Sequence, residues 1–239
     1  MYPPVYIPYR TPALICAEKH LIRAGAAVTA DPEDSDYILY PIPTALTALT
    51  DYTPGKTIIG GNLDFLNVSV HRIDLLKDPY YLAINAAITA EAALGLIVSN
   101  LPGALTEAYI LVMGWGRIGK CLTHQLMALN VTPTVYARNP VDQAMLSALG
   151  YDVVTSDELR SQLPDFDCII NTAPARILED YDARLIRKDC FKIDLASVLS
   201  IPGEGVLHAR GLPGKHKPEA SGALIAATVL RHLQGGAAL

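Results

Sequence analysis

A glycine-rich stretch, GWGRIG at 114–119, has the spacing of a turn that binds the pyrophosphate of a dinucleotide. It follows an apolar run at 108–113 and precedes an amphipathic segment at 117–129. In such a turn the first glycine permits the tight bend, the second lets the pyrophosphate approach the backbone, and the third lets the helix pack on the strand. The sequence therefore predicts a dinucleotide site, with a plain tight turn as the alternative, formed by Gly114, Trp115, Gly116, Arg117, Ile118 and Gly119.

The next expected strand, at 133–138, ends in Arg138 and Asn139. An NAD site usually places an acid about 20 residues after the glycine turn, to hold the ribose 2′-hydroxyl. Here the first carboxylate is Asp142, beyond Pro140 and inside the following expected helix. An arginine can instead pair with a 2′-phosphate through two hydrogen bonds. The pattern favours NADP over NAD, with Arg138 and Asn139 as cofactor-binding residues. The alternative is that Arg138 points into solvent.

Two later segments lead from expected strands to the same edge of a sheet. In CIINTAP (168–174), Thr172, Ala173 and Pro174 are predicted to lie near the nicotinamide ribose, because ligands bind at the carboxyl ends of parallel strands. The segment FKIDLAS (191–197) brings Asp194 to that edge as a candidate catalytic residue. An acid at a strand end can equally cap a neighbouring turn.

The elements that must position these residues alternate regularly. In the second half we expect strands at 108–113, 133–138, 151–154, 167–171 and 190–194, with helices at 117–129, 140–149, 157–163 and 220–233. This alternation predicts an α/β fold with a Rossmann-type doubly wound parallel sheet. The alternative is a flavodoxin-like sheet that binds no dinucleotide.

The first half predicts a smaller, compact α/β domain. Short β-rich runs stand at 5–8, 27–30, 37–41, 56–60 and 67–71, and a helix at 13–25 ends at Gly25, a suitable C-terminal cap. A long helix follows at 78–100, with Asp78 as its N-cap and Pro79 at its first position. We therefore expect a small domain at 1–77, a bridging helix at 78–103, and a nucleotide-binding domain at 104–239 that includes the C-terminal helix.

The composition excludes several classes of protein. About half of the 239 residues are hydrophobic and 18% are charged, which is typical of a globular protein. A net charge of −5 argues against a nucleic-acid binder. The scattered cysteines predict reduced thiols without a metal site, and neither a secretory signal nor a membrane span is expected. The sequence thus favours a cytoplasmic protein.

The chain resembles the family of the A subunit of dipicolinate synthase, which is related to D-2-hydroxyacid dehydrogenases. The similarity is carried by NAAITAEAAL (85–94), VMGWGRIGKCL (112–122), VYARNP (135–140), IINTAP (169–174), KIDLAS (192–197) and GLPGKHKPEASG (211–222). The resemblance implies an NADP-dependent oxidation of 4-hydroxy-tetrahydrodipicolinate or dihydrodipicolinate to dipicolinate during sporulation. It also implies a partner, the flavoprotein-type B subunit of dipicolinate synthase, and we expect a homo-oligomer.

Two features depart from the family pattern. The first domain is shorter than expected, with little between Ala30 and Gly60, and Glu219 stands where the family is expected to have a lysine. If that lysine binds substrate, an acid there would weaken dicarboxylate binding. The chain is therefore interpreted as a shortened or divergent member.

A dicarboxylate substrate calls for cations, since arginine pairs well with carboxylates. The candidate substrate-binding residues are Arg10, Arg176 and Lys215. Asn85 and Thr89 lie four residues apart on the long helix and share a face, which makes them candidate catalytic residues together with His216, the histidine expected in a loop. Solvent exposure or local packing is the alternative for each of these residues.

Two other functions remain open at this point. One is a D-2-hydroxyacid-type dehydrogenase, although the segment 191–197 lacks the arginine with which those enzymes hold the substrate carboxylate. The other is a catalytically weak NADP-binding protein that mainly docks a partner, which the short first domain and Glu219 favour.

Overall fold

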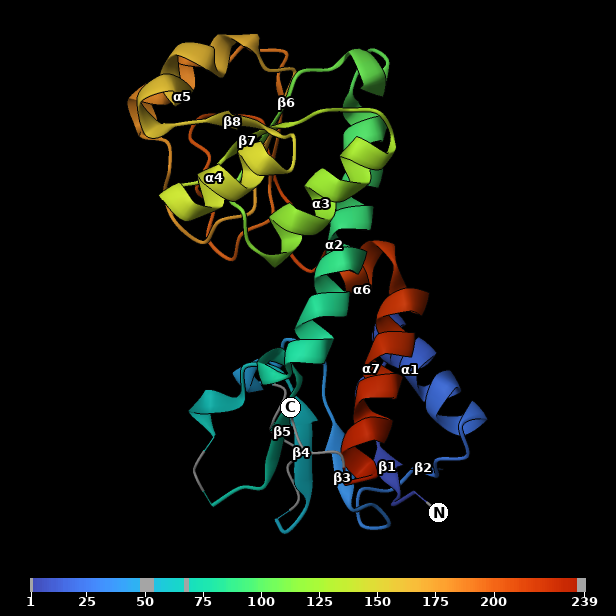
Figure 1. Ribbon diagram of the computed structural model, residues 1–239. Coiled ribbons are helices and arrows are strands. Elements are labelled where there is room, and N and C mark those ends of the chain that lie inside the picture. The colour runs from blue at the N-terminus through green and yellow to red at the C-terminus, as the bar shows by residue number, and fades with distance from the viewer. Residues whose placement is uncertain (1, 48–53, 67–68, 236–239) are drawn as a thin grey trace. The chain divides into compact units, whose positions relative to one another are not determined.

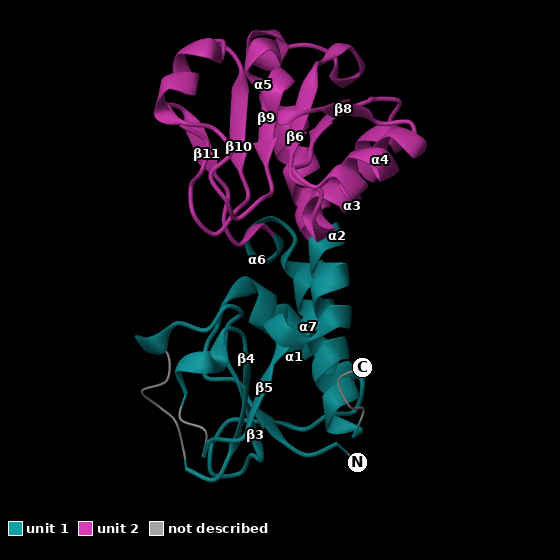
Figure 2. Ribbon diagram, turned by 60° about the vertical axis from the view of Figure 1, so that its left-hand side comes forward, with its two compact units in different colours: residues 1–88, 213–239 teal, residues 89–212 magenta. Residues whose placement is uncertain are grey.

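The computed structural model describes residues 2–47, 54–66 and 69–235, and the chain divides into two compact units (Figure 1). Unit 1 comprises Met1–Ile88 and Pro213–Leu239, and unit 2 comprises Thr89–Leu212 (Figure 2). Each unit contains one all-parallel sheet, so the predicted α/β class with two sheets is confirmed.

The sheet of unit 2 has six parallel strands in the order β11-β10-β9-β6-β7-β8. When β6 to β11 are counted as strands 1 to 6 and the sheet is read from β8, this is the 3-2-1-4-5-6 order of a doubly wound dinucleotide-binding fold. The central strand β6 pairs with β7 through Leu111 and Thr134, and with β9 through Leu111 and Ile169. The strands are β6 (Ile110–Met113), β7 (Thr134–Tyr136), β8 (Asp152–Val154), β9 (Cys168–Asn171), β10 (Phe191–Asp194) and β11 (Val206–His208).

Helices cover both faces of this sheet, and every residue of β6 is buried. On one face Val112 packs with Leu122 and Leu126 of α3 (Arg117–Ala128). On the other face Leu111 and Met113 pack with α5 (Ser156–Gln162). The helix α4 (Pro140–Ala148) packs beside β7. Alternate residues of one apolar strand thus enter two different cores, as a doubly wound sheet requires.

The sheet of unit 1 has five parallel strands in the order β2-β1-β3-β4-β5. The last strand differs from the expectation: it lies at 72–74 rather than 67–71, and residues 67–68 are outside the described part of the chain. The strands are β1 (Val5–Tyr6), β2 (Val28–Thr29), β3 (Tyr37–Leu39), β4 (Thr57–Gly60) and β5 (Arg72–Asp74).

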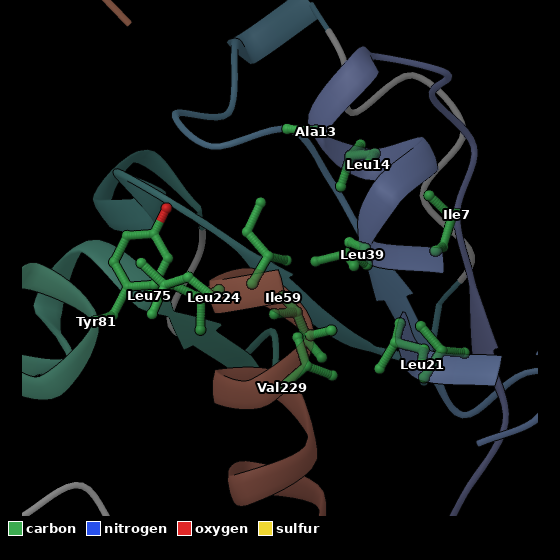
Figure 3. Packing of buried hydrophobic residues seen from close by; sticks show 14 of the residues in the cluster. Ile7, Ala13, Leu14, Leu21, Leu39, Ile59, Leu75, Tyr81, Leu224 and Val229 are labelled. Atoms are coloured by element: carbon green, nitrogen blue, oxygen red, sulfur yellow. The ribbon is translucent and has the colours of Figure 1, made fainter. Parts of the chain in front are cut away.

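Two helices, α1 (Pro12–Arg23) and α7 (Pro218–Leu233), pack side by side in unit 1 (Figure 1). Leu14 and Leu21 of α1 and Leu224 and Val229 of α7 share a core with the sheet residues Leu39 and Ile59 (Figure 3). A Cβ on Gly222 would lie 2.5 Å from Cys16 Cβ, so the glycine permits the close approach. The expected assignment of the C-terminal helix to the nucleotide-binding domain is corrected here, because its apolar face packs on α1.

The long helix α2 (Pro79–Asn100) contributes to both units. Its N-cap is Asp78, as predicted, and the side chain accepts a hydrogen bond from Tyr81 N at 3.0 Å. By length and composition this helix could cross a membrane, which is weak evidence by itself. In unit 2 its Ala93 and Ile97 are buried against the sheet core instead.

Shorter helical segments complete the described chain. They are α6 (Leu212–His216) and the 3₁₀ turns η2 (Leu63–Phe65), η3 (Leu75–Lys77), η4 (Leu105–Glu107), η5 (Leu163–Asp165) and η6 (Asp180–Leu185).

Candidate dinucleotide site

The glycine turn of unit 2 has the geometry that its spacing predicts. Gly114 has φ +107°, a conformation that favours glycine. A Cβ on Gly119 would lie 2.2 Å from Gly114 O, so α3 can pack against the turn only with glycine there. At Gly116, by contrast, a Cβ would meet no described atom within 4 Å. Gly116 is the glycine that the sequence predicts to let the pyrophosphate approach the backbone, and the space beside it is open.

The helix that follows begins without a side-chain cap. Its N-cap is Gly116, whereas Asn139 caps α4 in the same unit by accepting a hydrogen bond from Val141 N at 2.9 Å. The first amides of a helix lack partners inside the helix, and together with the helix dipole they attract anions. The start of α3 is therefore available to a phosphate group.

A cavity of about 330 Å³ opens at the carboxyl ends of β6, β7 and β9. Its lining brings together most of the predicted cofactor residues, while Arg117, Ile118 and Gly119 lie outside the set. The lining residues are Gly114, Trp115, Gly116, Tyr136, Ala137, Arg138, Asn139, Asp142, Thr172, Ala173, Pro174 and Ile177.

Arg138 stands just beyond the end of β7 with an exposed side chain. The described residues provide no hydrogen bond or ion pair to its guanidinium group. Asp142 lines the same cavity from the first turn of α4, where the helix dipole favours a negative charge. The sequence-based prediction left Asp142 out of the site. The signal that could have included it is its position three residues after the N-cap Asn139, which puts it in the first turn of α4.

The loop after β9 closes against the glycine turn. Thr172 N and Oγ1 both donate to Met113 O, at 2.8 and 3.1 Å. A Cβ on Gly114 would meet Thr172 Oγ1 at 2.7 Å, so the glycine is required for this contact. The loop at 172–174 is therefore one wall of the cavity.

Asp194 is completely buried and does not line the cavity. Its carboxylate accepts four hydrogen bonds at 2.7–3.1 Å, from Asn171 Nδ2 and from the backbone amides of Ala196, Ser200 and Ile201. A carboxylate engaged in this way has no exposed surface for a substrate. The geometry favours the turn-capping alternative for Asp194 over the catalytic one.

The candidate substrate and catalytic residues are divided between the units. Thr89, which is buried, and Arg176 belong to unit 2. The Arg176 guanidinium is bound within its own loop, 2.5 Å from Asp180 and 3.4 Å from Glu179. The others belong to unit 1: Arg10, Asn85, Lys215 and His216.

Within unit 1, Lys215 and His216 are exposed on α6, and Arg10 is paired with Glu18 at 2.5 Å. Asn85 is partly buried on α2.

Glu219 has partners of its own in unit 1. Its carboxylate lies 2.8 Å from His20 Nε2. Hydrogen bonds to Cys16 and His20 lower the pKa of the Glu219 carboxyl. The pKa of the Cys16 thiol is raised, by burial and by its hydrogen bond to Glu219, which makes it a poor nucleophile. Glu219, which differs from the residue expected at this position, is therefore part of the contact between α1 and α7.

The cysteines are free thiols, and among the residues that the structure describes no cluster of three His, Cys, Asp or Glu side chains could hold a metal ion.

The fold is that of NAD(P)-dependent dehydrogenases. A D-isomer specific 2-hydroxyacid dehydrogenase from Xanthobacter autotrophicus Py2, solved in complex with NADPH, matches the chain with a TM-score of 0.58 at 14% identity, over 100% of this chain and 97% of that one. At this identity the match shows the fold alone.

More specifically, the chain resembles the A subunit of dipicolinate synthase. The Bacillus subtilis protein is 27% identical over 150 residues, which cover 59% of this chain and half of that relative's length. The structure of the Bacillus halodurans protein has a TM-score of 0.81 at 20% identity, and the alignment covers 98% of both chains. No family model matches the chain.

Proposed function

We propose that the protein is an NADP-dependent oxidoreductase that converts dihydrodipicolinate, formed from 4-hydroxy-tetrahydrodipicolinate by loss of water, to dipicolinate. The assignment of NADP rests on the cavity, because the uncapped start of α3 and the exposed Arg138 both belong to its lining. The similarity to the A subunit of dipicolinate synthase supports the assignment of dihydrodipicolinate as the substrate. A cytoplasmic role in sporulation belongs to the same proposal.

Bound NADP+ would supply the hydride acceptor, so that the dihydropyridine loses a hydride and a proton as it becomes aromatic. The chain's own residues hold the cofactor. The amides at the start of α3 would bind the pyrophosphate, Arg138 would bind the 2′-phosphate, and the loop at 172–174 would lie near the nicotinamide ribose. These residues fit the group because Gly114 and Gly119 keep the turn narrow while Gly116 leaves room above it.

The substrate carboxylates require cations, and the proposal retains Arg10, Arg176 and Lys215 for this task. His216 is retained as the base that removes the proton, with Asn85 and Thr89 as polar groups that orient the ring. Arg10 must exchange Glu18 for the substrate, and Arg176 must leave Asp180. Both exchanges should cost little free energy, because exposed ion pairs contribute only about 0–1 kcal/mol to stability.

The cofactor is tested by calorimetric titration of the purified protein with NADPH and NADH. We expect NADPH to bind at least tenfold more tightly, about 1.4 kcal/mol, and Arg138→Ala to abolish the preference. The matched control is Arg184→Ala, which removes an exposed arginine of the same unit outside the cavity lining. A preference for NADH that disappears in Asp142→Asn would contradict the proposal and assign the ribose to Asp142.

The reaction is tested by incubating the protein with NADP+ and the product of 4-hydroxy-tetrahydrodipicolinate dehydration. The expected result is an increase in NADPH absorbance, with dipicolinate as the product. Turnover that requires an added flavoprotein-type partner would support a partnership, with this chain as the NADP-binding member. Oxidation of D-2-hydroxyacids instead would replace the substrate assignment and leave the cofactor assignment intact.

A further inference from the structure

A buried pair, Asn171 and Asp194, connects two loops at the carboxyl edge of the sheet in unit 2. We propose that this pair positions the nicotinamide half of the cofactor site, and that Asp194 acts through these loops rather than on the substrate. The inference rests on the proposed NADP site and extends it to residues that the cavity lining does not include.

The first loop follows β10 and is held by the Asp194 carboxylate. Oδ1 accepts hydrogen bonds from Asn171 Nδ2 at 3.0 Å and Ala196 N at 2.9 Å, and Oδ2 accepts from Ser200 N at 2.7 Å and Ile201 N at 3.1 Å. Because both oxygens are used and the side chain is fully buried, the carboxylate determines the path of residues 195–201.

The second loop follows β9 and is held by Asn171. Its Oδ1 accepts from Ala173 N, and its Nδ2 donates to Ala173 O, both at 3.1 Å. The same Nδ2 donates to Asp194. One buried amide therefore links the loop at 172–174, a wall of the cavity, to the loop at 195–201.

The strand order places these loops on the nicotinamide side. β6 carries the glycine turn, β7 with Arg138 lies on one side of it, and β9 and then β10 lie on the other. A dinucleotide with its 2′-phosphate at the end of β7 and its pyrophosphate at the turn must extend its other half over the ends of β9 and β10. The two linked loops follow these strands directly.

The loop at 195–201 presents two apolar side chains to solvent, with Val198 69% and Leu199 48% exposed. His208 Nε2 lies 2.9 Å from Ala196 O and supports the loop from β11. The hydrogen bonds to Asp194 and His208 hold the loop in the conformation in which these two side chains are exposed. The nicotinamide ring could pack against Val198 and Leu199. Such an apolar wall would exclude water from the site of hydride transfer.

The test compares two ligands that differ in the nicotinamide half. Calorimetry measures the Kd values of NADPH and of 2′-phospho-ADP-ribose, which lacks the ring. In Asp194→Asn one oxygen becomes an NH₂ group that cannot accept a backbone hydrogen bond. We expect this change to weaken NADPH about tenfold and to leave 2′-phospho-ADP-ribose within about twofold. A purely structural role would change both affinities together.

The matched control is Asp74→Asn. The Asp74 carboxylate also accepts backbone amides, from Asn62, Leu63 and Leu76, but it does so in unit 1. This variant should leave the ratio of the two Kd values unchanged. If Asp194→Asn does not fold, as judged by circular dichroism, Leu199→Ser tests the same wall at an exposed position and should also weaken NADPH selectively.

Equal weakening of both ligands by Asp194→Asn, or an unchanged ratio in the folded variants, would overturn the inference while the NADP site stands. If the wild type binds neither ligand, the proposed function itself fails, and this inference fails with it.

Discussion

In each unit the first strand, β1 in unit 1 and β6 in unit 2, is followed by a helix, and the two helices start in different ways. In unit 1, Thr11 caps α1 by accepting a hydrogen bond from Leu14 N at 3.3 Å, and Pro12 occupies the first position. In unit 2, Gly116 begins α3 with no side-chain cap. A cap satisfies a helix amide from within the protein, whereas a glycine leaves it available to an anion. The same βα element is thus structural in one unit and a candidate ligand site in the other.

The carboxyl edges of the two sheets differ in the same sense. In unit 1, Thr44 Oγ1 accepts a hydrogen bond from Gly61 N at 3.1 Å, and a Cβ on Gly60 would lie only 2.3 Å from that oxygen. The edge at this point is filled by the protein's own side chains. In unit 2 the edge at Gly116 is open. Parallel topology offers a possible site in both sheets, and local side chains decide which one is available.

The largest expected effect comes from opening a closed helix start in unit 1. Asp78 caps α2, and its buried carboxylate is bound to Arg231 and lies 2.9 Å from His232 Nε2. Asp78→Ala leaves these partners without their anion and should reduce the free energy of unfolding of unit 1 by about 3 kcal/mol.

Denaturant unfolding followed by circular dichroism measures this change, and the single tryptophan, Trp115, reports on unit 2. The control Asp180→Ala removes an exposed partner of Arg176 and should change stability by less than about 1 kcal/mol. An equally small effect of Asp78→Ala would contradict the importance of the closed start.

The second effect comes from the glycine turn. Gly119→Ala places a Cβ against Gly114 O and should destabilise unit 2 by about 2 kcal/mol and abolish NADPH binding. Gly95→Ala, on α2 where a Cβ meets no described atom within 4 Å, is the control and should be neutral or stabilising. Unfolding followed by Trp115 fluorescence measures the change. A Gly119→Ala protein with wild-type binding would refute the assigned role of the third glycine.

Acid should affect unit 1 through Asp78. Burial by itself would raise the pKa of this carboxyl, but hydrogen bonds from Arg231, Tyr81 N and His232 outweigh burial and lower it to about 2. Because the folded pKa lies below the unfolded value of about 3.9, the stabilisation is complete above about pH 4 and is lost as the pH falls towards 2. The loss is at most about 3 kcal/mol. Asp78→Ala should remove this part of the pH dependence, and acid titration of both proteins checks it.

The smallest effects come from exchanging the two helix starts. Thr11→Ala should cost about 1 kcal/mol in unit 1, without effect on NADPH binding. Gly116→Ser adds a cap to α3, changes stability by only a few tenths of a kcal/mol, and should weaken NADPH binding because the side chain enters the open space. Thermal unfolding and calorimetry separate the two outcomes. Unchanged binding in Gly116→Ser would show that the open start of α3 is not used.

Several elements of the fold and site were predictable from the chain itself. The glycine turn between β6 and α3, the caps at Asp78 and Gly25, and the alternating elements of unit 2 each depend on contacts within a few residues. Local backbone geometry and apolar periodicity are written in the sequence, because neighbours in the chain determine them. The resemblance to the A subunit of dipicolinate synthase rests on the same local segments.

Other features depend on residues far apart in the chain, and only the tertiary structure decided them. α7 packs on α1 because Gly222 fits against Cys16, a contact that no local pattern in either helix reveals. Asp194 becomes a buried anchor because Asn171 and three backbone amides converge on it. A strand-end acid has the same sequence signature whether it binds a substrate or a turn. The number of donors that surround it is set by the packing of β9 against β10 and the loops that follow them.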